Sequence, residues 1–206
     1  MPKLISKEVY QYSELSEEAQ EKARDWCREA SMGDNYFSEY VIEDAVRMAE
    51  IIGIEISMRD GKKSEPKIYW SGFSSQGDGA CFEGRYHYTK GAVKKIKAET
   101  NDKELIRISE QLQDVQKSYF YRLSANMKHQ GRYSHSNAMS VDVDYSGDDS
   151  RDISDAGDEV TQLMRDFADW IYSNLEKEWD YQNSDEAVEE TILTNKYDFN
   201  EDGSIY

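Results

Sequence analysis

The sequence predicts an α+β fold, in which an antiparallel sheet of about five strands carries helices packed against it. Some segments repeat apolar residues at three- and four-residue steps, as helices do, and others alternate apolar with polar residues, as half-exposed strands do. No internal repeat or low-complexity linker divides the 206 residues, and this length suits one domain with a sizeable core. We therefore expect a single α+β domain over residues 1–206.

The N-terminal part of the chain predicts two helices between two strands. Weak alternation over residues 3–12 indicates an edge strand, and Ser16 is a suitable N-cap for a helix over residues 17–30. A second helix over residues 37–52 is expected to end at Gly53, and Ile54, Ile56 and Met58 then alternate as a strand. The expected buried positions of the two helices are Ala19, Ala23, Trp26, Cys27 and Ala30, and Tyr40, Val41, Ala45, Met48, Ala49 and Ile52.

Residues 67–88, KIYWSGFSSQGDGACFEGRYHY, combine aromatic residues, which favour strands, with four glycines, which favour turns. They predict two strands joined by a glycine-rich loop, and with the preceding strand an antiparallel meander. The loop is long enough to hold a ligand, but the GK[ST] of a phosphate loop is absent, and a wide structural turn is the favoured interpretation. The possible ligand-loop residues are Ser74, Ser75, Gln76, Gly77, Asp78 and Gly79.

The C-terminal part predicts three helices and a hairpin. Asn101 and Glu104 resemble a capping pair that opens a helix with the stripe Leu105, Ile108, Leu112, Val115 and Tyr119. Alternation over residues 119–128 and 139–145 predicts two paired strands, and residues 146–157 indicate an acidic loop. A long helix over residues 158–179 is expected to bury Val160, Leu163, Met164, Phe167, Trp170, Ile171 and Leu175, and Ser184 caps a last helix to about Thr194.

The blocks YWSGF and QGDGACFEG, together with ELSEEAQEKA at residues 14–23, resemble small proteins encoded by tailed phages and prophages. The resemblance runs over most of the chain. It implies a phage accessory protein acting in the cytoplasm of an infected bacterial host, and it implies no catalytic residues. Some proteins of this kind carry the label antitoxin, so an antitoxin-like interaction module is one alternative.

Charge restricts the class of partner. The chain has 25 basic and 42 acidic residues, a net charge of −17, which opposes direct binding to a nucleic-acid backbone. No apolar run approaches the length of a membrane span, and no signal peptide is evident, so we expect no membrane partner.

Two cysteines, Cys27 and Cys81, fit reduced thiols better than a disulfide framework. Lys90, Lys94, Lys95 and Lys97 form a basic patch that we interpret as solvated surface.

The sequence predicts no catalytic residue, no metal and no cofactor. His129 and His135 flank a hairpin loop without an evident third ligand. Cys81 and His87 would lie on one strand face about 20 Å apart, too far for a hydrogen bond. Residues 198–203 fit the opening D-x-N-x-D-G of a calcium loop but lack the acidic twelfth position, so a terminal turn is favoured.

Acidic residues are concentrated in the C-terminal half, at residues 142–158 and 180–190. Carboxylates on a rigid helix can imitate a nucleic-acid backbone and occupy a basic groove on a partner. We therefore expect stoichiometric binding to a host bacterial protein with a basic surface, as an anti-defence inhibitor of a nucleic-acid-binding or defence protein. A small-ligand binder or enzyme using residues 72–84 is a second alternative. The expected partner-binding residues are Asp158, Glu159, Asp166, Asp169, Glu176 and Glu178.

Overall fold

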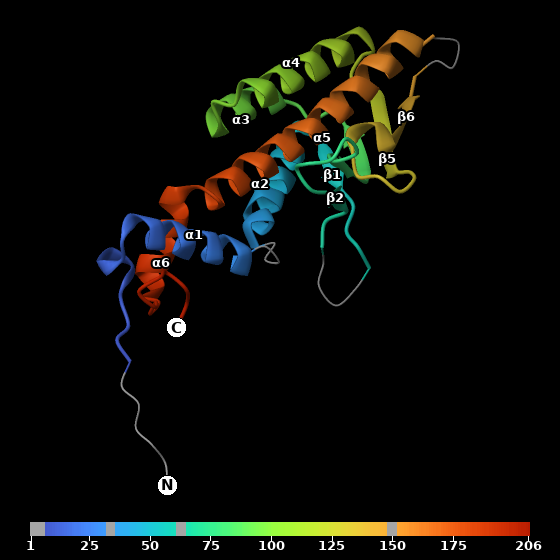
Figure 1. Ribbon diagram of the computed structural model, residues 1–206. Coiled ribbons are helices and arrows are strands. Elements are labelled where there is room, and N and C mark those ends of the chain that lie inside the picture. The colour runs from blue at the N-terminus through green and yellow to red at the C-terminus, as the bar shows by residue number, and fades with distance from the viewer. Residues whose placement is uncertain (1–6, 32–35, 61–64, 148–151) are drawn as a thin grey trace. The chain divides into compact units, whose positions relative to one another are not determined.

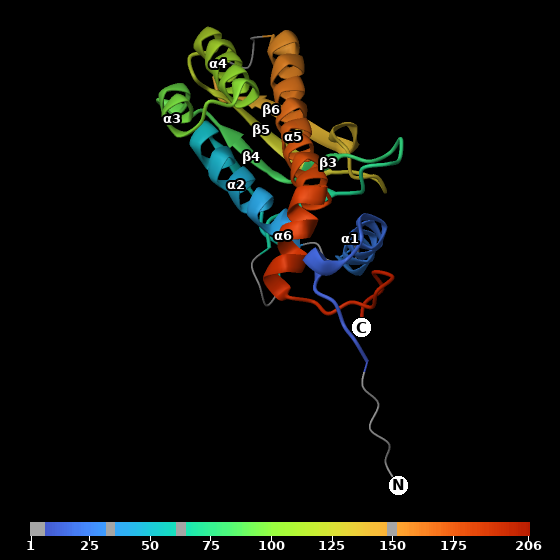
Figure 2. The same cartoon turned by 60° about the vertical axis from the view of Figure 1, so that its left-hand side comes forward.

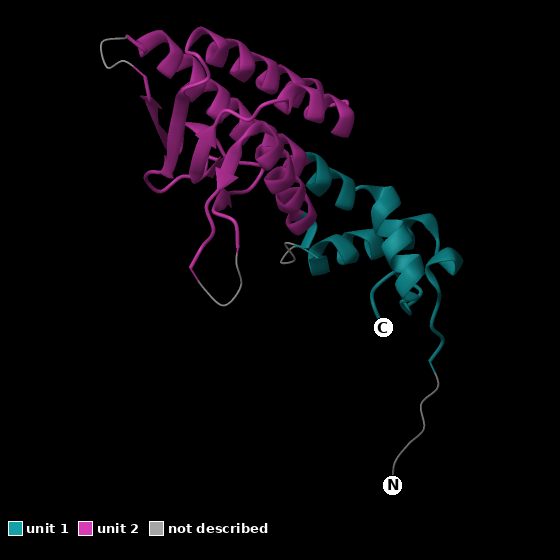
Figure 3. Ribbon diagram, turned by 180° about the vertical axis from the view of Figure 1, so that it is seen from behind, with its two compact units in different colours: residues 1–37, 177–206 teal, residues 38–176 magenta. Residues whose placement is uncertain are grey.

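The computed structural model describes residues 7–31, 36–60, 65–147 and 152–206, and it shows an α+β fold (Figure 1). Contacts divide the chain into two compact units, residues 1–37 with 177–206 (unit 1) and residues 38–176 (unit 2), coloured in Figure 3. The single-domain organisation over residues 1–206 stays a prediction. The α-helices are α1 (Glu17–Ser31), α2 (Tyr36–Ile52), α3 (Ala92–Glu99), α4 (Lys103–Ser118), α5 (Ser154–Gln182) and α6 (Asp185–Asn195).

The sheet of unit 2 confirms the predicted antiparallel architecture. Four strands pair in the order β1 (Ile54–Ile56), β4 (Gly84–His87), β5 (Leu123–His129) and β6 (Met139–Tyr145). A separate pair joins β2 (Ile68–Trp70) to β3 (Ala80–Phe82), the hairpin expected in residues 67–88. The predicted pairing of the segments 119–128 and 139–145 is present, with seven paired positions.

The expected meander of three consecutive strands is wrong. β1 pairs with β4 rather than with β2, and β2 pairs with β3. Backbone bonds from Ser57 to Glu83 (2.8 Å), Lys67 to Ser57 (2.7 Å) and Glu83 to Lys67 (2.9 Å) connect the two ladders. β1 and β2 therefore lie in line along one continuous segment, residues 80–87. Between them along the chain, Met58 forms an isolated antiparallel bridge with Pro66.

Figure 2 shows α2, α4 and α5 on one side of the sheet. The strand residues on that side are buried, as alternation predicts: Leu123, Ala125 and Met127 of β5 are covered, whereas Lys128 is exposed. All seven predicted apolar positions of the long helix are buried, and Phe82 packs edge-on against Phe167 with ring centroids 5.6 Å apart. This shared core fixes the position of the glycine-rich hairpin on unit 2.

Unit 1 has its own small core, which is assembled from both ends of the chain. A 3-10 turn (η1, Tyr12–Glu14), α1 and α6 pack around the cluster Tyr12, Leu15, Ala19, Ala23, Cys27, Val188, Ile192 and Phe199. Instead of the expected strand over residues 3–12, Tyr10 forms an isolated bridge with Phe199, and residues 1–6 lie outside the described ranges. The predicted caps Ser16 and Ser184 both accept backbone hydrogen bonds, at 3.3 Å in each case.

Several predicted details are wrong for identifiable reasons. Asp102, not Asn101, caps α4, because its carboxylate accepts the N–H groups of Glu104 and Leu105 at 2.9 Å. Phe120 and Tyr121 have positive φ values, 55° and 61°, so a turn separates α4 from β5 where the patterns of helix and strand overlapped.

Local packing accounts for the remaining differences. Tyr40 is 78% exposed, and Ala30 is exposed as well, so neither contributes to the core. The lysine-rich residues 92–99 form α3, a helix that the sequence reasoning did not anticipate. The expected helix break at residues 32–35 and part of the acidic loop, residues 148–151, lie outside the described ranges.

Candidate functional site

The glycine-rich loop between β2 and β3 is held closed by its own aspartate. The Asp78 carboxylate accepts backbone N–H bonds from Ser74 (3.0 Å) and Ser75 (2.7 Å), and Ser71 donates to the carbonyl of Gly79 (3.1 Å). The N–H group of Ser75 is the largest cause of a lowered Asp78 pKa, because this donor favours the charged carboxylate. Asp78 therefore builds the turn, which leaves the exposed Ser74, Ser75 and Gln76 as the loop residues that face solvent.

The loop is docked on the segment between β5 and β6 through two of its glycines. A Cβ at Gly77 would lie 3.2 Å from the Tyr133 ring, and one at Gly79 would lie 2.6 Å from the Cβ of His135. Only glycine permits the second approach, because a distance of 2.6 Å is well inside van der Waals contact. These glycines serve close packing between two loops, which supports the structural interpretation of the loop.

The other side of the loop is anchored to α5 by aromatic contacts. The Tyr172 hydroxyl donates to the carbonyl of Gly72 (2.9 Å), and the Phe73 ring lies 5.5 Å from Tyr172 and 5.7 Å from Trp70. Tyr172 did not enter the sequence reasoning, because it is a half-exposed tyrosine beside the predicted buried stripe. Its pairing with a residue 100 positions away carries no local signal.

The histidines take part in packing rather than in a ligand cluster. His129 stacks on Tyr69 with ring centroids 4.6 Å apart, and its Nε2 donates to the carbonyl of Tyr133 (3.0 Å). Nearby, the Glu83 carboxylate accepts from Lys67 (2.8 Å) and Tyr69 (3.1 Å), and the Lys67 bond is the main cause of its lowered pKa. Within the described ranges, no group of three or more His, Cys, Asp or Glu side chains is arranged to hold a metal ion.

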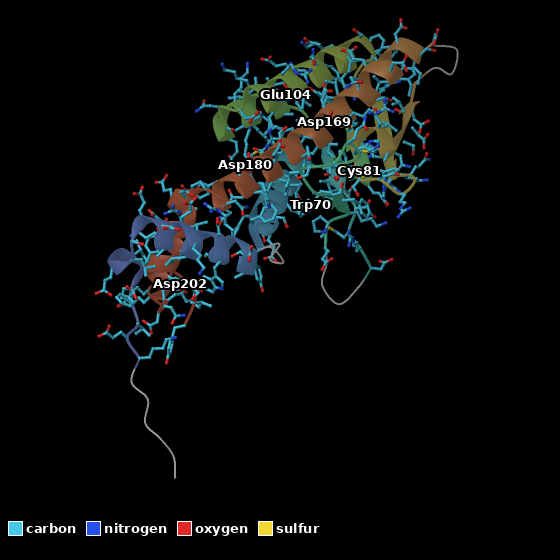
Figure 4. All side chains as sticks on the ribbon, in the orientation of Figure 1. Trp70, Cys81, Glu104, Asp169, Asp180 and Asp202 are labelled. Atoms are coloured by element: carbon cyan, nitrogen blue, oxygen red, sulfur yellow. The ribbon has the colours of Figure 1, made fainter. Side chains whose placement is uncertain are left out.

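Asp169, His135 and Ser136 come together beside the docked loop. Asp169 lies midway along α5 (Figure 4), and burial of its carboxyl raises its pKa, an effect that a hydrogen bond from Ser136 opposes in part. A nucleophilic triad places the histidine between the serine and the carboxylate. Here the serine bonds to the carboxylate directly, so the order of a nucleophilic triad is not present in this cluster.

The cysteines are poor nucleophiles. Cys81 is fully buried in β3, and burial raises the pKa of its thiol to about 12. Burial also raises the pKa of Cys27. Since the thiolate is the reactive form, neither thiol is prepared for covalent chemistry near neutral pH.

The D-x-N-x-D-G segment forms a terminal turn in which protein groups already use both carboxylates. Asp202 pairs with Lys22 (2.6 Å) and accepts from the Ser204 hydroxyl (2.6 Å), contacts that lower its pKa. Asp198 accepts from Gln11 (2.6 Å), and Gly203 has a φ of +82°. Residues 198–203 therefore form a turn whose two carboxylates bind side chains of the N-terminal segment, Gln11 and Lys22.

The six acidic residues proposed for α5 divide into two groups. At 100° per residue, Asp158 and Glu176 lie about 160° from the centre of the buried stripe, and Glu159 lies about 100° from it. All three are exposed and form no ion pair with a described residue. Asp166 lies on the same side but pairs with Arg107 and accepts from Gln162 (2.7 Å).

The other two members also depart from the expected acidic row. Asp169 is partly desolvated, and Glu178 lies toward the opposite side of the helix and accepts from Gln182 (2.8 Å). The structure therefore does not bring all six together as one row of free carboxylates.

The net negative charge is unevenly distributed between the units. Unit 1 has 17 acidic and 7 basic residues, a net charge of −10 within 67 residues, whereas unit 2 has 25 acidic and 18 basic residues, a net charge of −7 within 139. A shallow depression on unit 1 is lined by Glu186, Glu189, Glu190, Leu193 and Thr194 of α6. Arg24 pairs with Glu189 (3.3 Å), whereas Glu186 and Glu190 have no basic partner among the described residues.

These observations define a class: an α+β protein with an acidic surface, whose polar clusters build turns and packing contacts. Residues 37–185 match a protein family described as "Domain of unknown function (DUF8835)", and the chain belongs to this family. The matched segment covers all of unit 2 and only a small part of unit 1. No curated protein and no solved structure matches the chain.

No helix within the described ranges is both long enough and apolar enough to cross a membrane.

Proposed function

We propose that this protein is a phage-encoded accessory protein that acts in the cytoplasm of an infected bacterium by stoichiometric binding. Its partner is a host nucleic-acid-binding or defence protein with a basic surface, which it inhibits by occupying that surface with carboxylates in place of phosphates. The proposal combines the resemblance to phage and prophage proteins with the acidic charge of the chain.

The observation that carries the proposal is the free carboxylates of α5. Asp158, Glu159 and Glu176 project from exposed positions outside the buried stripe of one continuous helix, and no basic group within the described ranges forms an ion pair with them. A carboxylate held on a rigid helix loses less entropy on binding than one on a mobile segment. Glu178 lies toward the other side of the helix and accepts from Gln182, so it is not part of this surface. Asp166 and Asp169 are assigned to internal contacts that support the helix.

The proposal predicts binding that depends on charge rather than on a pocket. Attraction between exposed charges is screened by salt, so affinity should fall as the ionic strength rises from about 50 to 500 mM. A small ligand held by Ser74, Ser75 and Gln76 would give the opposite pattern, in which binding withstands salt and is lost when these loop residues change.

The first experiment is affinity capture of the partner from infected host cells, followed by its identification and titration with the purified protein. The triple variant D158K/E159K/E176K should fold normally and lose affinity. The matched control E39K/E43K/E50K changes the net charge by the same amount on α2, where all three glutamates are exposed. The control should bind like the wild-type protein, apart from a small general effect of net charge.

Competition with nucleic acid tests the mimicry itself. If the captured partner binds DNA or RNA, added nucleic acid should displace the protein from it. Equal loss of binding in the two triple variants would show that only net charge matters, and full binding by D158K/E159K/E176K would refute the assignment to α5. A captured partner that is a toxin encoded beside this protein would favour the antitoxin alternative.

A further inference from the structure

β6 is the outer strand of the four-stranded sheet, and it is also one of the two longest strands. The strand order places β5 on one side of it and, within the described ranges, no strand on the other (Figure 1). All seven of its residues pair with β5, so the backbone is held extended over its whole length. Long edge strands of this kind are templates for pairing with another chain.

The register shows which backbone groups face outward. At the two ends of the β5–β6 ladder, Ser146 donates to Arg122 (3.1 Å) and Gln130 donates to Ala138 (2.7 Å). Hydrogen-bonded pairs recur at every second residue of an antiparallel ladder, so Ser140, Asp142 and Asp144 are the residues of β6 that bond to β5. The N–H and C=O groups of the intervening residues, Val141 and Val143, therefore point away from the sheet.

These four outward groups have no partner within the part of the chain that the structure describes. No hydrogen bond joins the backbone of Val141 or Val143 to a described residue on the open side of β6. The N–H and C=O groups of Val141 and Val143 thus have the spacing and direction that an added strand requires for backbone hydrogen bonds.

The side chains of β6 differ between its two faces. Val141 and Val143 are half-buried, and a Cβ at Gly157 of α5 would lie 3.9 Å from the Cβ of Val143, which places this valine on the helix-covered face. Asp142 and Asp144 are exposed on the other face and form no ion pair with a described residue. In a strand added at this edge, the residues opposite the aspartates would project on the same exposed face.

We propose that the open edge of β6 is a docking site for an extended segment of a partner protein, which adds as a fifth strand to the sheet. The segment has basic residues at alternate positions, opposite Asp142 and Asp144, and apolar residues between them, next to Val141 and Val143. Its main chain bonds to the outward groups of the two valines, and its charges set the register.

A second copy of the same chain fits this edge poorly. In the antiparallel register that pairs Val141 of one copy with Val143 of the other, Asp142 would lie directly opposite Asp142. Like charges at directly opposite positions destabilise a strand pair. The charge of β6 therefore selects a basic segment over self-association.

The site is separate from the carboxylates of α5 and does not depend on the proposed function. Asp142 and Asp144 lie on the exposed face of the sheet, whereas the α5 carboxylates lie on a helix that packs against the other face. Changes in either set leave the other set intact, so the two proposals can fail independently.

The test uses the full chain and two synthetic peptides, acetyl-Ser-Val-Lys-Val-Lys-Val-Ser-amide and the matched peptide with glutamate in place of lysine. Amide hydrogen exchange is followed by NMR. In the free protein, the amides of Val141 and Val143 should exchange fast, while those of Asp142 and Asp144, bonded to β5, should be protected. Saturation with the lysine peptide should slow exchange at the two valines by at least about tenfold, and the glutamate peptide should not.

Two variants complete the test. D142K/D144K keeps the backbone unchanged and should reverse the preference between the two peptides. The glutamate peptide should then slow amide exchange at Val141 and Val143, and the lysine peptide should not. V143P removes one outward N–H and should abolish protection at Val141; if it fails to fold, the charge variant decides alone. D158K/E159K/E176K should respond to the lysine peptide like the wild-type protein.

Three results would overturn the proposal. The first is an absence of protection at Val141 and Val143 with the lysine peptide, and the second is equal protection by both peptides. The third is slow exchange at both valines in the free protein together with a dimeric mass in sedimentation, which would assign the edge to a second copy.

Discussion

Replacement of Gln116 by alanine should remove a structural connection between α4 and the sheet. Gln116 is fully buried; its amide nitrogen donates to the Leu123 carbonyl (2.8 Å) and the Tyr86 hydroxyl (3.3 Å), and its amide oxygen accepts from the Leu123 N–H (3.2 Å). The last β4 residue, His87, pairs with Ser124, so Leu123 lies just beyond the end of its neighbouring strand. The side-chain amide of Gln116 therefore bonds to the backbone of Leu123 in the place where a further residue of β4 would bond.

The magnitude follows from the groups left unpaired. The variant leaves two buried backbone groups of Leu123 without partners, and each unsatisfied buried group costs about 1–3 kcal/mol. We expect a loss of about 3 kcal/mol in the free energy of unfolding, which for a chain of this size lowers Tm by about 6–12 °C. Urea unfolding followed by circular dichroism measures the loss, and the exchange rate of the Leu123 amide locates it.

A control on the same helix separates this bond network from helix propensity. Gln113 is half-exposed and forms no hydrogen bond with a described side chain, so Q113A should change stability by less than about 0.5 kcal/mol. If Q116A and Q113A unfold at the same urea concentration, or if the Leu123 amide stays protected in Q116A, the reasoning is refuted.

Three further outcomes test the surroundings of the glycine-rich loop. G79A should destabilise the protein, because the new methyl carbon would lie 2.6 Å from His135; G72A, whose nearest neighbour is the Asp78 side chain at 3.4 Å, is the control in thermal melts. D169N should stabilise the protein at pH 7: a raised carboxyl pKa means that ionisation opposes folding above that pKa, so the gain should disappear below the unfolded pKa of about 3.9. Iodoacetamide at pH 8 should leave Cys81 unmodified in native protein and alkylate it in urea, as mass spectrometry would show.

Much of the fold could be predicted because its signals are local. The apolar stripe of α5 and the alternation of β5 and β6 each arise within one segment, and burial follows them closely. The caps of α1 and α6 are similarly local, since a serine side chain reaches a backbone N–H only three residues away. These features depend on helix and strand geometry, which the order of side chains expresses directly.

The candidate sites were less predictable, because partners distant in the sequence decide whether a charged residue is free. Asp166 and Glu159 are both acidic and occupy similar positions in the helical pattern of α5. Yet Asp166 pairs with Arg107 of α4, and Glu159 has no partner among the described residues. From its sequence context Asp78 is a possible ligand-binding residue, but in the structure its carboxylate accepts the N–H groups of Ser74 and Ser75 within its own turn. The sequence marked acidic positions but could not assign them to solvent or to internal contacts.

The sequence by itself determined the class of fold, the segments that become helices and strands, and the acidic character of the protein, because each depends on periodicity or composition. The tertiary structure decided the rest: the pairing of β1 with β4, the docking of Gly79 against His135, and the open edge of β6. Strand pairing joins residues far apart in the chain, and many pairings satisfy the same alternation. Only the packing of the whole sheet against its helices selects one of them.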